Sequence, residues 1–244
     1  MPTCLAEVVE VLALTYDVRE IVLKMIDPPA LQFVGGQYIA IEITEMKNGH
    51  PHLNNRPYSI ASPPSDSEVI RLCVDRVGEG PGSTYLHALK PGDRLEFLSP
   101  LGYYTVDDQK TTALLFVATG TGIAPIKSMI GNLLQTGSLR PILLYWGLRM
   151  EEDLYYQEEL AAWARQHPHF QYVTTLSQPT STWQGVRGRV TDHIPSVIAG
   201  SEHRLSVDDV DAYLCGNFEM IKEVRAILLA HGVPKKAIHF EKFY

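Results

Sequence analysis

The first 110 residues consist of short alternating or β-branched runs that are separated by turn residues. Such runs, with Gly, Pro and Asp between them, are typical of antiparallel strands in a barrel or a sandwich. The runs cover residues 6–14, 19–26, 37–43, 68–77 and 93–99. The sequence therefore predicts an antiparallel β domain in the first half of the chain.

From about residue 111 the pattern changes to alternating strands and helices. Continuous apolar or β-branched runs predict strands at 113–118, 141–147, 170–176, 211–216 and 237–243. Apolar residues at helical spacing predict helices within 126–134, 151–166 and 218–232. This alternation indicates a parallel α/β sheet. We predict a β-barrel domain over residues 1–108, followed by a parallel-sheet α/β domain over residues 109–244.

Composition narrows the classes of function. The chain has 244 residues, of which 45% are hydrophobic and 20% charged, and this suits two packed domains. A net charge of −7 without any basic run argues against a nucleic-acid partner. No apolar run is long enough to span a bilayer, and the N-terminus does not resemble a secretory signal. We therefore expect a cytoplasmic protein with no membrane span.

The cysteines and histidines do not predict a metal site. Cys4, Cys73 and Cys215 lie far apart, which argues against a disulfide framework, a zinc site and an iron–sulfur cluster held by four thiolates. His50 and His52 have no third ligand nearby in the sequence. We interpret the segment around them as an exposed loop and expect no metal.

A glycine-rich turn, in the segment FVATGTGIAP, joins the strand at 113–118 to the helix that follows. Glycines allow the backbone to approach a ligand closely, and the free N–H groups at a helix start attract anions. Pro125 suits the first helical turn, where its missing N–H costs nothing. The third glycine of the dinucleotide fingerprint is absent, so a tight turn without a ligand remains an alternative.

Two motifs of the first half carry further candidate chemistry. RPYSIAS places Arg56, Tyr58 and Ser59 on one strand, where they offer a fork for phosphate, a ring for stacking and a hydroxyl. The alternative is a strand with one core aromatic and two surface polar groups. GPGSTYL, residues 80–86, is a second glycine-rich turn before a predicted helix. One phosphate cradle in each half predicts two phosphate-bearing ligands, such as a flavin and a nicotinamide.

The motifs RPYSIAS, GPGSTYL, ATGTGIAP, YLCGNFEMI and FEKF, in this order, resemble those of the ferredoxin–NADP reductase superfamily. Within that superfamily, the chain is most similar to the reductase components of bacterial oxygenases and to the bacterial NAD(P)H:flavin reductases. The resemblance implies a flavin-binding antiparallel barrel followed by a nicotinamide-binding parallel sheet. It also implies that FAD and either NADH or NADPH are the cofactors, and that electrons pass to a separate acceptor.

On the flavin side, the resemblance implies that Arg56 contacts the phosphates, Tyr58 stacks on the ring, and Ser59 bonds near N5, the atom that accepts hydride. Ser59 is therefore expected to be catalytic. The turn at 82–84 is expected to hold a pyrophosphate, which favours FAD over FMN. The other residues expected at this site are Pro57, Cys73, Val74, Gly82, Ser83 and Thr84.

On the nicotinamide side, the resemblance places Cys215 beside the nicotinamide ring as a catalytic candidate, with a buried small hydrophobe as the alternative. Glu241 is expected to relay a proton, and Phe243 to lie on the flavin face where nicotinamide must stack. In the alternatives, Tyr244 takes that role, or Phe240 and Phe243 simply pack in a core strand. The other residues expected to line this site are Thr119, Gly120, Thr121, Gly122, Pro125, Arg149 and Gly216.

Three functions remain open from the sequence. The first is a reductase with tightly held FAD that serves a one-electron carrier such as a ferredoxin or an oxygenase component. The second is a flavin reductase that releases reduced flavin, which Asn217 after the CG pair favours. The third is a non-catalytic flavin- or nucleotide-binding subunit of a complex. We expect NADH to be preferred, because neutral Gln178 follows Ser177 where NADPH-preferring members carry Arg, although Arg149 can reverse this.

Overall fold

The computed structural model describes residues 3–47, 50–76, 78, 80–199 and 205–242. The chain divides into two compact units, residues 1–106 with 127–132 and residues 107–126 with 133–244. Among the described residues, no helix has the length and apolar character needed to cross a membrane.

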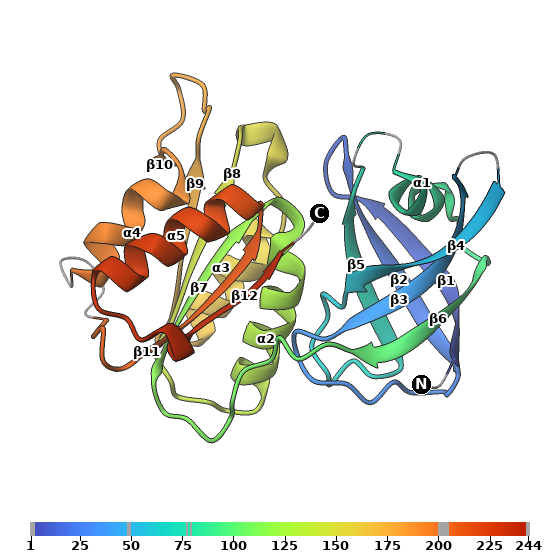
Figure 1. Cartoon of the computed structure of the whole chain (residues 1–244), viewed down its shortest axis with the longest axis horizontal. Helices are drawn as coiled ribbons and strands as arrows, with labels where there is room; N and C mark the ends of the chain where they lie inside the picture. Colours follow the sequence, from blue (N-terminus) through green and yellow to red (C-terminus); the bar gives the residue numbers. More distant parts are fainter. Residues whose placement is uncertain (1–2, 48–49, 77, 79, 200–204, 243–244) are drawn as a thin grey trace. The chain divides into compact units, whose positions relative to one another are not determined.

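The first unit contains one curled antiparallel sheet in the order β4-β3-β6-β1-β2-β5 (Figure 1). An isolated antiparallel bridge between Ile60 and Leu72 links the end of one edge strand to the other edge strand, so the sheet curves back on itself. The predicted antiparallel barrel is confirmed as this half-barrel. Its strands and its helix are β1 (Thr3–Ala13), β2 (Val18–Asp27), β3 (Tyr38–Lys47), β4 (His50–Ser59), β5 (Val69–Asp75), β6 (Arg94–Leu101) and α1 (Pro81–Ala88).

The core of this unit is formed by apolar side chains that occur at every second position of its strands. Ile21, Leu23 and Met25 lie two positions apart on β2, and all three belong to the buried cluster of the half-barrel. Because side chains alternate between the two faces of a strand, a period of two places these residues on the inner face. The helix α1 adds Leu86 to the same cluster.

The interpretation of His50 and His52 as loop residues was wrong. Both lie on β4, in register with Lys47 and Glu45 of β3. Their polar surroundings suggested a loop, but pairing with β3 supplies the backbone partners that make the segment a strand. Both side chains are exposed, and no group of three metal-ligating residues occurs in the described parts of the chain.

The second unit contains a parallel sheet in the order β10-β9-β8-β7-β11-β12. This confirms the predicted α/β architecture. The chain moves outward from β7 to β8 and β9, then returns to place β11 on the other side of β7, so strand order reverses between β7 and β11. The strands are β7 (Ala113–Thr119), β8 (Ile142–Leu148), β9 (Phe170–Leu176), β10 (Val186–Arg187), β11 (Val210–Gly216) and β12 (Ile238–Lys242).

Helices cover both faces of this sheet. Figure 1 shows α4 and α5 in front of the sheet and α3 behind it. Ile194 of α4 and Val224 of α5 join Leu115, Val117 and Leu214 of the sheet in one buried cluster. The helices are α2 (Ile123–Gln135), α3 (Gln157–Gln166), α4 (Val190–Ile198) and α5 (Phe218–Ala230), with short 3₁₀ turns η1 (Gly120–Gly122), η2 (Glu151–Asp153) and η3 (Lys235–Ala237).

The sequence analysis did not predict α4 or the two-residue strand β10. Helix α4 contains Pro195 in its interior, which removes a backbone donor and usually marks a helix end. Ile194 and Val197 are buried in the core, and the Asp192 carboxylate accepts a hydrogen bond from the Arg189 N–H at 2.8 Å. Packing and this cap therefore sustain a helix that local sequence disfavours.

Candidate functional site

In the second unit, the candidate residues gather where β7 and β11 end. Gly216 has φ +130°, and a Cβ there would lie 2.3 Å from Thr119 Oγ1 and 2.6 Å from Thr119 O. The Asn217 N–H donates to Thr119 Oγ1 at 2.9 Å. This is the point where strand order reverses, and in parallel α/β sheets ligands bind outside the carboxyl ends of the strands at such a point.

The turn η1 approaches the end of β11 closely. A Cβ on Gly122 would lie 2.4 Å from Cys215 O and 2.7 Å from Gly216 Cα, so only glycine fits. Gly120 differs, because it has φ +52° and a Cβ there would meet nothing within 4 Å. The turn is therefore packed tightly at Gly122 and open at Gly120. Pro125 lies in the first turn of α2, as predicted. A backbone cradle open on one side and followed by a helix start fits a pyrophosphate.

The helix start at α5 is arranged differently. The Asn217 side chain accepts hydrogen bonds from the N–H groups of Glu219, at 2.9 Å, and of Met220, at 3.4 Å. Asn217 therefore caps the helix itself and satisfies two of the donors that a ligand would otherwise meet. From the sequence, Asn217 favours a flavin reductase, and this cap is not predicted.

Cys215 and Glu241 are neighbours on parallel strands. They are register partners of β11 and β12, and Cys215 is fully buried. Burial, with the Glu241 carboxylate as a second cause, raises the pKa of the Cys215 thiol well above its ordinary value. The thiol therefore stays protonated near neutral pH and does not supply a thiolate nucleophile. Phe243, the predicted flavin-facing ring, lies outside the described residues. Phe240, which the alternative placed in the core, is 49% exposed.

Arg149 and Gln178, the candidates for cofactor choice, lie at the ends of β8 and β9. The Gln178 N–H donates to Arg149 O at 2.7 Å. The Arg149 guanidinium forms an ion pair with Asp153, with Nε 3.3 Å from Oδ2. The structure thus brings the two candidates together, and it engages Arg149 with a carboxylate that the sequence analysis did not predict.

In the first unit, the start of α1 packs against β4. A Cβ on Gly82 would lie 2.3 Å from the Tyr58 hydroxyl and 3.2 Å from Arg56 Cγ. Burial raises the pKa of Tyr58 to about 12, so the phenol is neutral. Gly82 of the GPGSTYL motif is thereby brought together with Arg56 and Tyr58 of the RPYSIAS motif. A glycine-rich turn beside a guanidinium and an aromatic ring fits a ligand that carries both phosphate and a planar ring.

Arg56 has a partner that the sequence did not reveal. Its Nε donates to Glu45 Oε1 at 2.7 Å, and a second nitrogen of the guanidinium contacts the same oxygen. This hydrogen bond holds the pKa of the Glu45 carboxyl below its usual value. Glu45 lies on β3, where only strand pairing brings it to Arg56.

The other candidates of the first unit surround this contact. Ser59 is buried at the end of β4, and Cys73 and Val74 are buried on β5, which contacts both β4 and α1. His87 Nε2 lies 3.2 Å from Val74 O, which ties α1 to β5. The remaining candidates belong to β4 or to the first turn of α1: Pro57 is exposed, Ser83 Oγ donates to Gly80 O at 3.1 Å, and the Thr84 N–H donates to the same oxygen at 2.9 Å.

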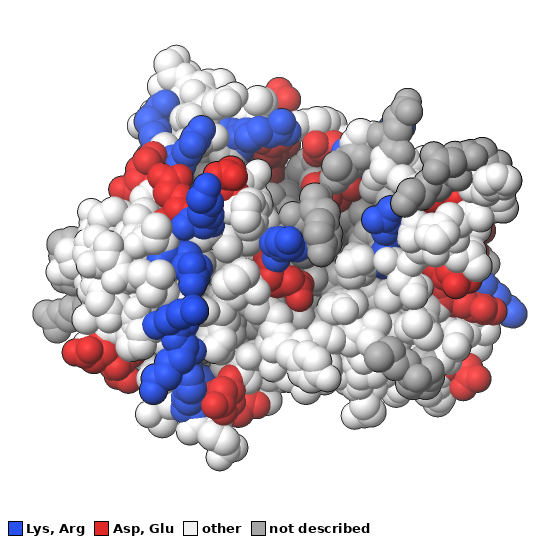
Figure 2. Space-filling view, in the orientation of Figure 1, with Lys and Arg blue, Asp and Glu red and all other residues white. Residues whose placement is uncertain are grey.

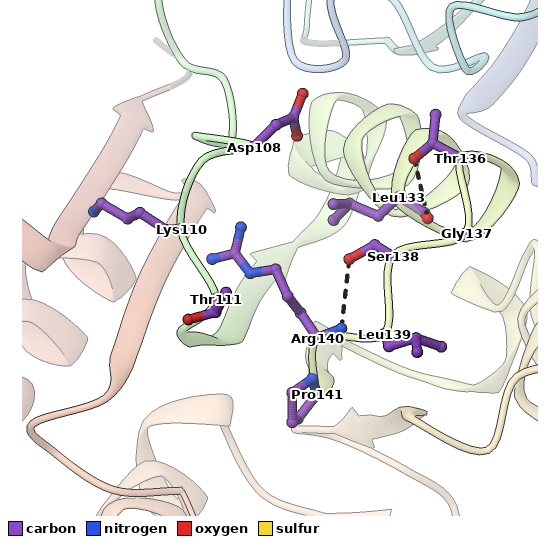
Figure 3. A pocket seen from close by; sticks show the side chains of 10 residues that line it. All are labelled: Asp108, Lys110, Thr111, Leu133, Thr136, Gly137, Ser138, Leu139, Arg140 and Pro141. Carbon is purple, nitrogen blue, oxygen red and sulfur yellow. Dashed lines mark hydrogen bonds between the residues drawn. The ribbon is translucent and has the colours of Figure 1, made fainter.

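A hollow of about 580 Å³ lies at the opposite, amino ends of β7 and β8 (Figure 3). Arg140 and Lys110 line it, yet both are engaged with the buried Asp211 carboxylate, at 3.7 Å and 2.8 Å. Burial raises the pKa of Asp211, but hydrogen bonds from Lys110 and Thr112 outweigh burial and keep that pKa below its usual value. This network fastens the chain before β7 to the sheet, so we regard the hollow as structural.

Comparison with known proteins assigns each half of the chain to a domain family. Residues 5–105 match the family described as Oxidoreductase FAD-binding domain, and residues 116–226 match the Oxidoreductase NAD-binding domain. The chain is 36% identical over 239 residues to Ferredoxin–NADP reductase B of Sorangium cellulosum (strain So ce56), covering 98% of this chain and 96% of the relative.

Two further relatives have longer chains. The reductase component of phenol 2-monooxygenase from Pseudomonas sp. (strain CF600) is 32% identical over 221 residues, covering 88% of this chain but 58% of the relative. The crystal structure of an Amycolatopsis cytochrome P450 reductase superposes with a TM-score of 0.83 at 28% identity, covering 99% of this chain and 70% of the other. The chain therefore belongs to the ferredoxin–NADP reductase superfamily, as a flavoprotein oxidoreductase that moves electrons between NAD(P)H, FAD and a separate acceptor.

Proposed function

We propose that this reductase holds FAD tightly and delivers electrons from NADH to a separate iron–sulfur protein, such as a ferredoxin or an oxygenase component. The proposal rests on the number and the positions of the cysteines. Cys4, Cys73 and Cys215 lie far apart in the sequence, and all three are buried and outside any disulfide. These three residues do not form the four-thiolate set that an iron–sulfur cluster requires. The names of the relatives given above support an iron–sulfur or oxygenase partner.

The proposed roles of the flavin-side residues follow from their chemistry. Bound FAD accepts hydride from NAD(P)H and passes electrons on one at a time. Arg56, held in place by Glu45, supplies positive charge to the phosphates, and the neutral Tyr58 supplies a ring for stacking. The N–H groups at the start of α1 hold the pyrophosphate, and Ser59 orients the reacting ring. We also propose that the flavin-binding domain ends at residue 108 and the nicotinamide-binding domain begins at residue 109.

The nicotinamide-side roles are proposed in the same way. The open backbone of η1, at Gly120 and Thr121, holds the cofactor's pyrophosphate. The neutral Cys215 thiol shapes the pocket beside the nicotinamide ring, and Glu241 on the adjacent strand holds or moves a proton. Phe243 covers the flavin face. Truncation after Lys242 is expected to leave FAD bound while nicotinamide stays longer on the flavin, which a stronger charge-transfer absorbance would report.

The acceptor is tested with the purified, FAD-loaded protein. We expect stoichiometric FAD after prolonged dialysis, and rapid NADH-dependent reduction of a purified [2Fe–2S] ferredoxin. Protein that loses its flavin on dialysis, and that turns over added FMN instead, would favour the flavin reductase that releases its product. If the protein oxidises neither NADH nor NADPH with any acceptor, ferricyanide included, the remaining hypothesis is a non-catalytic flavin- or nucleotide-binding subunit.

A cationic surface of the second unit supports a negatively charged partner. Figure 2 shows Lys and Arg side chains in a column on the face that carries α5, although the whole chain has a net charge of −7. Lys222 of α5 and Lys235 and Lys236 of η3 are exposed. Because salt screens such charges, the rate of carrier reduction is expected to fall as ionic strength rises, whereas the rate of ferricyanide reduction is expected to fall less. Location in the cytoplasm stays a prediction, which cell fractionation tests.

The preference for NADH rests on Gln178 and on the engagement of Arg149 with Asp153. Arg149, the cation that could reverse the preference, already pairs with the Asp153 carboxylate, with Nε 3.3 Å from Oδ2. We expect kcat/KM for NADH to exceed that for NADPH by about tenfold, and Gln178→Arg to narrow or reverse the ratio. A clear NADPH advantage in the unsubstituted protein would refute the assignment.

The catalytic role of Ser59 is tested by Ser59→Ala. Ser59 is buried, and the change removes one hydroxyl. We expect the single-turnover rate of flavin reduction by NADH to fall by about tenfold or more while FAD remains bound, because the hydroxyl orients the ring and does not anchor it. An unchanged rate would contradict the assignment.

A further inference from the structure

A buried tryptophan of the sheet contacts η1, the turn that we propose holds the cofactor's pyrophosphate and that we call the pyrophosphate turn. Trp146 lies on β8 and is fully buried, and its indole Nε1–H donates to Gly120 O at 3.0 Å. Register places Trp146 beside Ala118, and Gly147 beside Thr119, on the neighbouring strand β7. The indole thus reaches past the end of β7 to the first residue of η1.

We infer that Trp146 is the positioning residue of the pyrophosphate turn. In a trans peptide, the carbonyl and the following N–H point in opposite directions because the group is planar. Holding the Gly120 carbonyl on the indole therefore turns the Thr121 N–H away from the sheet interior. That N–H belongs to the backbone proposed to receive the cofactor's pyrophosphate, so the inference rests on the proposed function of this turn.

The turn needs such a tether at this position. Gly120 has φ +52°, a conformation that glycine adopts freely, and a Cβ there would meet nothing within 4 Å. Within η1 the Gly120 carbonyl accepts a hydrogen bond from the Ile123 N–H, which is the turn's own restraint on the peptide that follows Gly120. The hydrogen bond from the buried Trp146 indole is a second restraint on the same carbonyl, and it ties this peptide to the neighbouring strand β8. A preorganised amide avoids the loss of conformational freedom that ordering it during binding would cost.

The indole is itself held by an aromatic row. The Trp146 ring meets the Tyr155 ring edge-on, with centroids 4.8 Å apart and planes at 86°, and Tyr155 meets Tyr156 at 5.1 Å and 65°. Tyr156 has φ 56°, the left-handed conformation that residues with side chains rarely adopt. These contacts place Trp146 in one orientation, which is what a positioning residue requires.

The test compares two tryptophan substitutions in the FAD-loaded protein. Trp146→Phe keeps an aromatic ring in the sheet and removes the indole donor, together with the volume of one ring of the buried side chain. The matched control is Trp163→Phe on α3, whose ring packs on Phe170 with centroids 6.2 Å apart. The ligand is ADP-ribose, which carries the pyrophosphate but no nicotinamide, so calorimetry measures binding independently of turnover. Adenosine serves as the ligand without phosphate.

We expect Trp146→Phe to weaken ADP-ribose binding about tenfold, the scale of one hydrogen bond that orients a binding group. The KM for NADH should rise by a similar factor, while bound FAD and the limiting rate of flavin reduction change less than about twofold. Adenosine binding, and every measurement on Trp163→Phe, should stay close to the unsubstituted protein. Unchanged ADP-ribose affinity, or an equal loss in Trp163→Phe, would overturn the inference.

Two further results separate this inference from the proposed function. If ADP-ribose does not bind the unsubstituted protein, the nucleotide assignment of the turn itself is wrong. If Trp146→Phe does not fold, the ¹⁵N-labelled indole signals of the unsubstituted protein decide. We expect the Trp146 indole signal to shift on ADP-ribose binding, whereas the position of the Trp163 indole signal should not change. A Trp146 signal that does not move would also overturn the inference.

Discussion

The two candidate phosphate-binding turns, at the start of α1 and at η1, each contain a glycine that lies very close to other atoms. The neighbouring atoms are of a different kind in each turn. In the first unit, a Cβ on Gly82 would meet the Tyr58 hydroxyl at 2.3 Å and the Arg56 side chain at 3.2 Å. In the second unit, a Cβ on Gly122 would meet the Cys215 carbonyl at 2.4 Å and Gly216 Cα at 2.7 Å. The first turn thus faces side chains and the second faces backbone.

This difference determines how each turn responds to change. A tyrosine hydroxyl is the far end of a side chain, and a small rotation moves it. The end of β11 cannot move in this way, because its backbone is paired with β7 on one side and β12 on the other. A contact with paired backbone therefore constrains sequence more strictly than a contact with a side chain.

The largest effect is expected for Gly122→Ala. Its methyl group would displace η1 from β11, so stability should fall by about 2–3 kcal/mol, as for overpacked cores. Displacement of the turn by a fraction of an ångström should lower kcat/KM for NADH by about 100-fold, because hydride transfer depends on alignment. FAD content should remain, since the flavin site lies in the other unit. Urea unfolding and stopped-flow reduction by NADH measure these effects.

Gly120→Ala is the matched control for this change. It adds the same methyl group to the same turn, where nothing lies within 4 Å, and its cost in stability is the left-handed conformation at φ +52°. That cost is about 1–2 kcal/mol. An equal loss of stability in both variants would show that the contact with β11 is not what fixes the turn.

A smaller effect is expected for Gly82→Ala. Tyr58 and Arg56 can move aside, and alanine favours the first turn of α1 by up to about 1 kcal/mol over glycine, so stability should change little. FAD affinity should fall by about tenfold, because the two displaced side chains are the proposed flavin contacts. Fluorescence titration of the apoprotein with FAD checks this. Unchanged FAD affinity would remove Gly82 from the flavin site.

The smallest effect concerns two tyrosines, the partly buried Tyr58 of the first unit and the buried Tyr213 of the second. Burial raises the pKa of Tyr58 and of Tyr213 to about 12 in each case. Above pH 10 the unfolded tyrosines lose their protons while the folded ones keep them, so both contributions to stability decline as pH rises from about 10 to 12. Tyr213→Phe and Tyr58→Phe should each flatten this decline, measured by urea unfolding at several pH values. An unaltered slope in either variant would assign the alkaline loss elsewhere.

Residue patterns alone predicted the elements whose local signals agree with their packing. The continuous apolar run at 113–118 became β7, and the glycine-rich turn after it became η1. The prediction and the structure differ where tertiary contacts outweigh the local preference of the sequence. His50 and His52 became part of a strand because β3 pairs with them, and α4 formed despite Pro195 because its apolar residues are buried.

The sequence by itself determined the two architectures and the residues with candidate chemistry, because hydrophobic period and glycine position are local properties of the chain. Only the tertiary structure decided which groups meet. Glu45 reaches Arg56 through strand pairing, and the Trp146 indole holds Gly120 from 26 residues away. No local pattern encodes these contacts, since each joins separate segments whose side-chain directions are set only after the strands and turns have packed.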